Sequence, residues 1–578
     1  MSAYYEIYQK WVNEVKDPEL LKELAEIKDQ DDQIKERFYT NLDFGTGGIR
    51  GVLGAGTNRM NVLTVRRATQ GVADYLNKAC AAQPIQVIIA YDSRHKSREF
   101  ALESALVLAK NGIAAKVFRE LAPTPLLSFA VTHLKAQSGI VITASHNSKE
   151  YNGYKLYWSH GGQMTDQRAG DVIQCVNSIQ NELSVETMSR EEAEAKGLLV
   201  WLGDEVVSAY LARVQSLVQN PELVSQHASE LKIIYTPLHG AGLVPVTRLF
   251  KNLGFSQMRV VPDQAKPDPD FPTVKLPNPE DPAVYELALK MTRDFPADII
   301  LGSDPDADRA GVGCRGKDGK YVFLSGNQIG VLILDYLLTT KKARGALDAR
   351  HLVIKSVVTA QMGVDLAARH GVPYMNVLTG FKYIGELIDQ LAARGDYQYL
   401  FGYEESYGFL IGDFCRDKDA PQACMILAEA ALYHKQNGET LLDRLETLFG
   451  EMGCYLESQV NISLPGLSGM DRLAKIMAEL RRTSPKTIGG LEITYMKDFA
   501  EGGGEQGQSV LTSLTREFPV TNLLRYELKG DTAWCCIRPS GTEPKLKLYF
   551  GAKGAGRQEA QAMLDAMQKE LSAHINGI

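Results

Sequence analysis

A serine follows an apolar run in residues 139–147, Gly-Ile-Val-Ile-Thr-Ala-Ser-His-Asn. Open α/β sheets carry their reactive groups in loops beyond the carboxyl ends of the strands. Ser145 could therefore act as a nucleophile, provided that basic groups or a metal ion flank it. The same pattern also fits a serine that only caps a helix or a turn.

Three aspartates alternate with other residues in a second loop, SDPDADR, which also follows an apolar run. Asp304, Asp306 and Asp308 can turn their carboxylates toward one point. Clustered carboxylates repel each other and need a cation, and a set of oxygen ligands suits Mg²⁺. An EF-hand is excluded, because it needs glycine and glutamate where this chain has Arg309 and Arg315. An acidic, solvated turn is the alternative interpretation.

Two more segments could contact a sugar or an anion, each with less specificity. In residues 401–408, FGYEESYG, the carboxylates of Glu404 and Glu405 and the hydroxyl of Ser406 could accept hydrogen bonds from sugar hydroxyls, although a loop glutamate is usually just solvated. The glycine-rich residues 44–51, FGTGGIRG, contain Arg50. Their spacing is wrong for a dinucleotide-binding fingerprint, and no strand precedes them.

A fourth loop, residues 536–545 (CIRPSGTEPK), could hold a phosphate. The guanidinium of Arg538 can bind two phosphate oxygens at once, and the hydroxyls and backbone amides of the turn add donors. A simple Pro/Gly turn between two strands explains the loop equally well.

The elements that must position these loops follow one repeated design. Residues 84–118, 231–261 and 350–378 each read as an apolar strand, a polar loop, an amphipathic helix, a glycine and a second strand. Three copies predict three homologous α/β domains. Ahead of them, apolar residues at helical spacing in residues 6–35 predict a pair of helices.

The last part of the chain has a different pattern, which predicts a smaller α+β domain. A glycine-rich segment at residues 501–508 is expected to be a mobile loop. The expected strands are 454–462, 491–495, 534–538 and 545–550, and the expected helices lie near 470–482 and 558–575.

Composition limits the classes of function. The 578 residues are 44% hydrophobic and 23% charged, which excludes a disordered chain, and a net charge of −7 argues against nucleic-acid or anionic-membrane partners. No run reaches the ~18 apolar residues that a membrane span needs. The eight cysteines form no C-x-x-C pair, so free thiols in a reducing compartment are expected. We therefore expect a soluble, cytoplasmic protein.

Taken together, the loops resemble those of the α-D-phosphohexomutase superfamily, the phosphoglucomutases and phosphomannomutases. TASHN, DPDADR, GYEES and RPSGTEP occur in family order, and FGTGGIRG is a fifth match. The resemblance implies an α/β fold with four domains around a central cleft, three homologous mixed-sheet domains and a C-terminal α+β domain. The predicted boundaries are 1–40 for a helical extension, then 41–209, 210–323, 324–450 and 451–578 for the four domains.

The resemblance also implies a role for each residue. The catalytic group comprises the phosphoserine Ser145 and four side chains around the reacting phosphoryl group: Arg50, His146, Lys155 and Arg309. The metal group, which would hold one Mg²⁺ per chain, comprises Ser145, Asp304, Asp306 and Asp308. The substrate-binding group comprises Lys382, Glu404, Ser406, Arg538, Ser540, Gly541 and Thr542. Lys155 is the first candidate for the general base and His146 is the second.

The chain departs from the usual motifs of the family at two points. Ser148 stands where many members have proline, and DPDADR replaces the DGDGDR of shorter relatives. The DPDADR loop, the length of the chain, the helical N-terminus and residues 412–420, GDFCRDKDA, resemble the longer branch. The implied reaction interconverts glucose 1-phosphate and glucose 6-phosphate through glucose 1,6-bisphosphate, which is also the expected activator. Phosphopentomutase, phosphomannomutase, glucose-1,6-bisphosphate synthase, a phosphatase and a sugar-phosphate sensor are the alternatives. The oligomeric state is not predicted.

Overall fold

The computed structural model describes residues 2–45, 47–80, 84–464, 469–501, 518–530, 532–540 and 545–578. Gly541, Thr542 and nearly all of the glycine-rich segment 501–508 lie outside the described residues. The chain divides into two compact units. Unit 1 comprises Met1–Leu324, Gly380–Gly402 and Ser406–Tyr433, and unit 2 comprises Ser325–Thr379, Tyr403–Glu405 and His434–Ile578.

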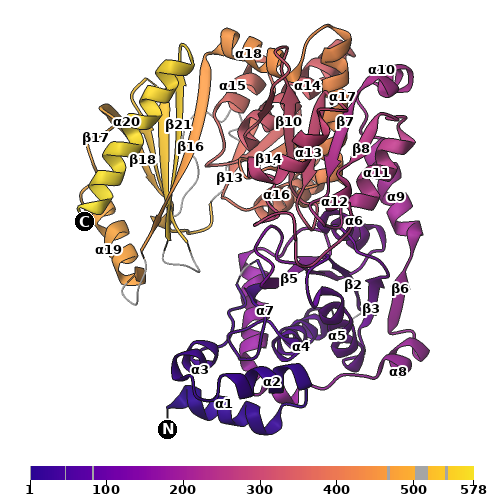
Figure 1. The fold of residues 1–578 in the computed structure, drawn as a ribbon. Helices are drawn as coiled ribbons and strands as arrows, with labels where there is room; N and C mark the ends of the chain where they lie inside the picture. The colour runs from indigo at the N-terminus through magenta and orange to yellow at the C-terminus, as the bar shows by residue number, and fades with distance from the viewer. Residues whose placement is uncertain are drawn as a thin grey trace. The chain divides into compact units, whose positions relative to one another are not determined.

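Three helices, not the predicted two, open unit 1 (Figure 1). The extended Val15 ends the first helix, and Asp17 starts the second by accepting hydrogen bonds from the N–H groups of its first turn. Trp11 and Phe38 are fully buried where the three helices pack. The helices are α1 (Ala3–Glu14), α2 (Pro18–Glu26) and α3 (Asp31–Phe38).

A six-stranded mixed sheet follows, in the order β1-β5-β4-β2-β3-β6. The strands β2, β3, β4 and β6 are parallel, and at one edge β5 is antiparallel to β4 and β1 is antiparallel to β5. Its strands are β1 (Ile49–Val52), β2 (Gln86–Tyr91), β3 (Ala114–Phe118), β4 (Ser138–Ile142), β5 (Tyr151–Trp158) and β6 (Leu199–Leu202). Its main helices are α4 (Val62–Ala79), α5 (Ser97–Lys110), α6 (Thr124–His133) and α7 (Asp166–Ser178), with α8 (Arg190–Ala195) before β6.

A second mixed sheet in unit 1 has the order β11-β10-β9-β7-β8. The parallel strands β8, β7 and β9 are extended by β10, which is antiparallel to β9, and by β11, which is antiparallel to β10. Its strands are β7 (Ile233–Thr236), β8 (Met258–Val260), β9 (Ile299–Ser303), β10 (Ala310–Arg315) and β11 (Tyr321–Phe323). Its helices are α9 (Asp204–Gln215), α10 (Pro221–His227), α11 (Leu243–Asn252), α12 (Pro262–Ala265) and α13 (Glu286–Met291).

The third α/β region is divided between the units. In unit 2, β12 (His351–Ser356) and β13 (Tyr374–Val377) form a parallel pair. The helices of this part are α14 (Gly326–Ala343), α15 (Met362–Arg369) and α18 (Leu441–Met452). The remaining elements, which lie wholly or mostly in unit 1, are α16 (Phe381–Arg394), β14 (Gln398–Glu404), β15 (Gly408–Leu410) and α17 (Ala420–Gln436).

The repeated design is confirmed in all three regions. A strand, a helix and a parallel second strand recur as β2–α5–β3, β7–α11–β8 and β12–α15–β13. After each helix a glycine (Gly112, Gly254 or Gly371) has a positive φ, between 69° and 84°. Only glycine adopts that turn at low cost, which explains why the helices end there.

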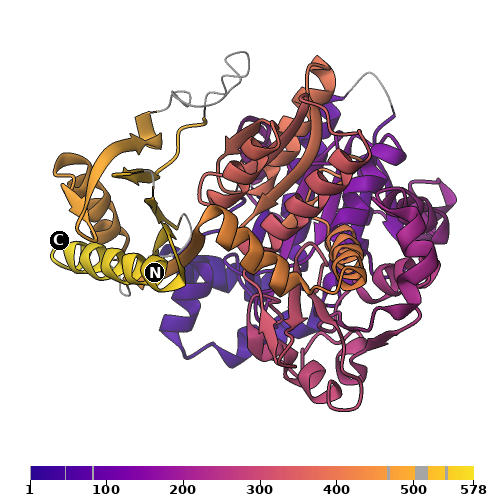
Figure 2. The ribbon, with the colours of Figure 1, turned by 90° about the horizontal axis from the view of Figure 1, so that it is seen from above.

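The C-terminal sheet of unit 2 is antiparallel, in the order β16-β21-β20-β19-β18-β17. The helix α20 (Arg557–Asn576) runs along it in both views (Figure 1 and Figure 2), and α19 (Gly469–Arg482) shares its apolar core. The predicted strands and helices are present, but two short strands were missed: β17 (Thr487–Ile488) and β19 (Leu524–Leu528). The others are β16 (Cys454–Ser463), β18 (Leu491–Asp498), β20 (Ala533–Pro539) and β21 (Lys545–Gly554). Within the described ranges, every helix is too short or too polar to span a bilayer.

Candidate active site

The serine loop begins where β4 ends, and its backbone is strained at the nucleophile. Ser145 has a φ of 51°, in the left-handed region that costs a residue with a side chain about 1–2 kcal/mol. Its N–H donates to Thr143 Oγ1 at 2.8 Å. The turn points the hydroxyl of Ser145 at the second sheet, where Oγ donates to Asp304 Oδ2 at 2.6 Å. The predicted nucleophile and the predicted metal loop therefore meet.

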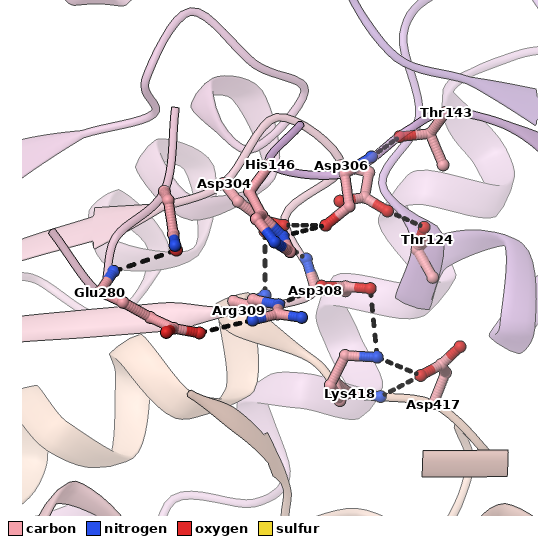
Figure 3. A network of polar contacts seen from close by, with 12 residues as sticks. Thr124, Thr143, His146, Glu280, Asp304, Asp306, Asp308, Arg309, Asp417 and Lys418 are labelled. Carbon is pink, nitrogen blue, oxygen red and sulfur yellow. Dashed lines mark hydrogen bonds and ion pairs between the residues drawn. The ribbon is translucent and has the colours of Figure 1, made fainter. Parts of the chain in front are cut away.

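The three aspartates of the metal loop form one buried cluster at the carboxyl end of β9 (Figure 3). One carboxylate oxygen from each of Asp304, Asp306 and Asp308 lies within 4.8 Å of the others. The loop turns sharply at Ala307, whose φ is 48°. The N–H groups of Asp308 and Arg309 both donate to Asp304 Oδ1 and fix that carboxylate.

The electrostatics of the cluster fit a divalent cation. Asp306 Oδ1 and Asp308 Oδ1 are buried and have no hydrogen-bond partner. Burial, together with repulsion from Asp306 and Asp308, raises the pKa of Asp304 well above its usual range. A buried carboxylate oxygen without a partner is costly, and a hard cation satisfies several of them at once. The three aspartates could therefore hold a metal ion, as the sequence predicts.

Two lysines reach the same carboxylates from different segments. Lys155, on β5, donates to Asp306 Oδ2 at 2.7 Å and to Asp308 Oδ2 at 3.1 Å. The ammonium of Lys418 lies 3.2 Å from Asp308 Oδ2 and 3.0 Å from Asp417 Oδ1. Burial acts to lower the pKa of Lys155, but Asp306 and Asp308 outweigh it, so the pKa is raised. The two carboxylates therefore favour the protonated form of Lys155.

Lys418 was missed as a site residue. In the sequence, residues 412–420 only indicate the longer branch. A lysine between two aspartates at the start of a helix is nevertheless a pattern that could have indicated a site residue. The segment is tied to the site at two points. Tyr157 donates to Asp417 Oδ2 at 2.7 Å, and the N–H of Ala420 donates to the carbonyl of Ala307 in the metal loop.

Asp419, in this same segment, predicts a pH dependence of stability. Burial raises its pKa to about 6, although Tyr210 and Gln422 donate to it. Because the pKa is raised on folding, the folded protein favours the protonated carboxyl. The contribution of Asp419 to the free energy of unfolding is therefore complete below about pH 4 and is lost as the pH rises through 6.

The variant Asp419→Asn has no carboxyl group to titrate at this position. Its free energy of unfolding minus that of the wild type should therefore rise by about 2 kcal/mol between pH 4 and pH 7. Urea titrations across this range would measure it, and a constant difference would contradict the raised pKa.

The remaining predicted catalytic residues surround the serine loop. His146 Nδ1 lies 3.1 Å from Ser145 Oγ. Burial, then the charges of Arg309 and Arg50, lower the pKa of His146 well below its usual range, so the imidazole is neutral near pH 7. Arg50, on β1, donates to Asn147 Oδ1 at 2.9 Å. Arg309 donates to Glu280 Oε1 at 2.6 Å beside the metal loop.

The predicted substrate-binding residues are divided between the two units. Lys382 lies in unit 1, where it donates to Asp166 at 2.7 Å, and Ser406 lies in the turn before β15. Glu404, Arg538 and Ser540 belong to unit 2, Arg538 on β20 and Ser540 immediately after it. The N–H of Ser540 donates to the carbonyl of Lys545 at 2.8 Å, so the predicted phosphate loop is closed at its base.

Comparison with known proteins agrees with this architecture. Models of phosphoglucomutase/phosphomannomutase match in four parts: α/β/α domains I, II and III at residues 41–183, 208–317 and 325–449, and the C-terminal domain at 505–568. Four domains, three of them α/β, are thereby confirmed.

Full-length relatives give the same assignment. A phosphoglucomutase of Staphylococcus epidermidis RP62A is 35% identical over 93% of this chain and 95% of its own length. One from Staphylococcus aureus MRSA252 is 35% identical over 96% and 97%. The solved open form of parafusin, a phosphoglucomutase of Paramecium, is 16% identical with a TM-score of 0.68 over 93% of this chain and 96% of its own, which shows a shared fold. The chain therefore belongs to the phosphoglucomutase/phosphomannomutase family.

Proposed function

We propose that the protein is an α-phosphoglucomutase, which interconverts glucose 1-phosphate and glucose 6-phosphate through phosphorylated Ser145 and a glucose 1,6-bisphosphate intermediate. Membership of the family makes it an isomerase that transfers a phosphoryl group. One observation supports the proposed chemistry above the others: the hydroxyl of Ser145 is hydrogen-bonded to a buried group of three carboxylates that also binds two lysines. The proposed compartment is the cytoplasm.

Asp304, Asp306 and Asp308 would hold one Mg²⁺, which when bound supplies positive charge to the oxygens of the phosphoserine. In the forward reaction the sugar hydroxyl attacks phosphorus. The bond from phosphorus to Ser145 Oγ breaks, and a bond to the sugar oxygen forms. Lys418 and Arg309 place two cations around this centre, where phosphoryl transfer depends on positioning and charge stabilisation.

The hydroxyl proton needs a base, and Lys155 is the first candidate. Its pKa is raised mainly by the nearby carboxylates of Asp306 and Asp308, with a further contribution from Asp417. When a cation takes up the negative charge of Asp306 and Asp308, burial and the charge of Lys418 both lower the pKa of Lys155, and only Asp417 opposes them. The neutral His146 is the second candidate, since its ring lies next to Ser145 Oγ.

A pair of substitutions separates the two lysines. Lys155→Met should lower kcat by about 100-fold or more and change KM by less than about threefold, because general-base catalysis contributes 10²–10⁴-fold. Lys418→Met, which removes a charge at similar burial, should lower kcat by a smaller factor. Steady-state kinetics with melting curves as a folding check would measure both. A rise in KM alone for Lys155→Met would make Lys155 a binding residue.

We propose that the other predicted residues bind the sugar phosphate. Glu404 and Ser406 would contact sugar hydroxyls in either orientation of the bisphosphate. Lys382 would contact the sugar phosphate. Residues of the loop after β20 would hold the phosphate that is not transferred: Arg538, Ser540, Gly541 and Thr542.

Phosphorus NMR tests the reaction and its substrate. The protein would be incubated with Mg²⁺, a trace of glucose 1,6-bisphosphate and, separately, the 1-phosphates of glucose, mannose and ribose. Fastest conversion of glucose 1-phosphate to glucose 6-phosphate is expected. Fastest conversion of ribose or mannose 1-phosphate would make the protein a pentomutase or a mannomutase. Release of inorganic phosphate would indicate a phosphatase, and formation of bisphosphate only with a separate phosphoryl donor would indicate a synthase.

A further inference from the structure

An arginine outside every motif that the sequence pointed to lies directly behind the serine loop. Arg94 follows β2 in the segment Asp92-Ser93-Arg94, and its side chain is fully buried. The Nε of Arg94 lies 3.4 Å from Asp92 Oδ2, and the backbone N–H of Arg94 donates to Asp92 Oδ1. Asp92 also accepts hydrogen bonds from Ser97 Oγ at 2.7 Å and Thr143 Oγ1 at 2.6 Å. The arginine is thus held in one position by a carboxylate that is itself fixed.

The guanidinium of Arg94 binds the backbone of the serine loop at four points. Nη2 donates to the carbonyls of Ser145 at 2.6 Å and Asn147 at 2.5 Å. Nη1 donates to the carbonyls of Ser148 at 2.8 Å and Tyr151 at 3.1 Å. The ring of Phe271 covers the guanidinium, with its centroid 5.0 Å away. One side chain therefore satisfies four carbonyls within seven residues.

These contacts explain how the strained conformation at Ser145 persists. A positive φ at a serine is unfavourable by itself and needs surroundings that determine it. Arg94 holds the carbonyl of Ser145, and Thr143, which donates to Asp92, accepts the N–H of Ser145. The peptide groups on both sides of the nucleophile are therefore bound to the same Asp92–Arg94 pair.

We propose that Arg94 is a positioning residue, which fixes the backbone of residues 145–151 so that the oxygen of Ser145 faces the carboxylate cluster. The inference rests on the proposed function, because it assigns a role in phosphoryl transfer from Ser145. Arg94 acts through the loop backbone. A lysine keeps the charge beside Asp92 but has no planar fork that could bind two pairs of carbonyls.

Two measurements on Arg94→Lys test the proposal. The first is hydrogen–deuterium exchange of the peptide that covers residues 143–151, which needs no activity. The second is the single-turnover rate of phosphoryl transfer from phosphorylated enzyme to glucose 1-phosphate, with KM measured alongside. Arg66→Lys is the matched control, because Arg66 forms a half-buried ion pair with Glu103 in the same domain.

In Arg94→Lys, exchange should accelerate in residues 143–151 alone, and the transfer rate should fall by about 100-fold, the cost of misplacing a reacting group by about 1 Å. KM should change by less than about twofold, and Arg66→Lys should match the wild type. Unchanged exchange in a folded Arg94→Lys protein would overturn the proposal. So would faster exchange with an unchanged transfer rate, or acceleration that extends over the whole first sheet, which would mean a structural role.

A second variant covers the case in which Arg94→Lys does not fold. Phe271→Leu removes the ring over the guanidinium and should produce the same local change with a smaller fall in rate. Unchanged exchange in the loop of Phe271→Leu would then count against the proposal. A wild-type enzyme that transfers nothing to glucose 1-phosphate would reject the proposed function, while the exchange measurement would still decide whether Arg94 holds the loop.

Discussion

Replacement of Ser145 by alanine should abolish phosphoryl transfer, with kcat lower by about 10⁴-fold or more. A methyl group cannot form the bond to phosphorus, so no phosphoenzyme can exist. The fold should survive, because the variant removes one oxygen and keeps the loop contacts of Arg94. Mg²⁺ binding should weaken but persist, since only the ligand from Ser145 is lost and the three carboxylates are unchanged.

Ser159→Ala is a suitable control, since Ser159 is exposed in the turn after β5 of the same domain. Its kcat should stay within about twofold of the wild type, as is usual for surface substitutions. A coupled assay for glucose 6-phosphate measures both variants. Turnover by a folded Ser145→Ala protein at more than about one per cent of the wild-type rate would exclude Ser145 as the phosphoryl carrier.

Loss of one carboxylate from the metal cluster should have the second large effect. Asp306→Asn should weaken Mg²⁺ binding by about 100-fold or more, because a neutral amide replaces a charged ligand whose Oδ1 has no other partner. The hydrogen bond from Thr124 to Oδ2 and the N–H bond from Thr124 to the Asp306 carbonyl can hold the loop in place. The loss should therefore be one of affinity and not of folding.

Isothermal calorimetry with Mg²⁺ measures this change. Asp318→Asn is the matched control, because Asp318 is an exposed aspartate between β10 and β11 of the same domain. Its Mg²⁺ affinity should equal that of the wild type. Equal affinities for Asp306→Asn and the wild type would show that the ligand set is wrong.

The fold was predictable wherever the signal is local. Each strand, helix and glycine of the repeated units lies in one stretch of about 30 residues, so sequence pattern alone located β2–α5–β3, β7–α11–β8 and β12–α15–β13. The same holds for β16, β18, β20 and β21. The helical pair predicted at the N-terminus was wrong, because two breaks, at residues 15–17 and 27–30, divide this segment into three helices. The boundaries between the domains stay predictions.

The meeting of Ser145 with the three aspartates was predicted only through the family resemblance, since 159 residues separate Ser145 from Asp304. Lys418 and Arg94 were missed for one reason. Their roles depend on partners distant in sequence, Asp308 for Lys418 and the carbonyls of residues 145–151 for Arg94. Neither residue type is distinctive in the sequence, because lysines and arginines are mostly solvated.

One measurement tests the central claim, that Ser145 carries the phosphoryl group that the sugar receives. The enzyme would be labelled with ³²P on Ser145 from glucose 1,6-bisphosphate and mixed with Mg²⁺ and unlabelled glucose 1-phosphate in a single turnover. The label should leave Ser145 at the rate of catalysis and appear in glucose bisphosphate and glucose 6-phosphate. Label that stays on the protein while glucose 6-phosphate forms, or that appears only as inorganic phosphate, would contradict it.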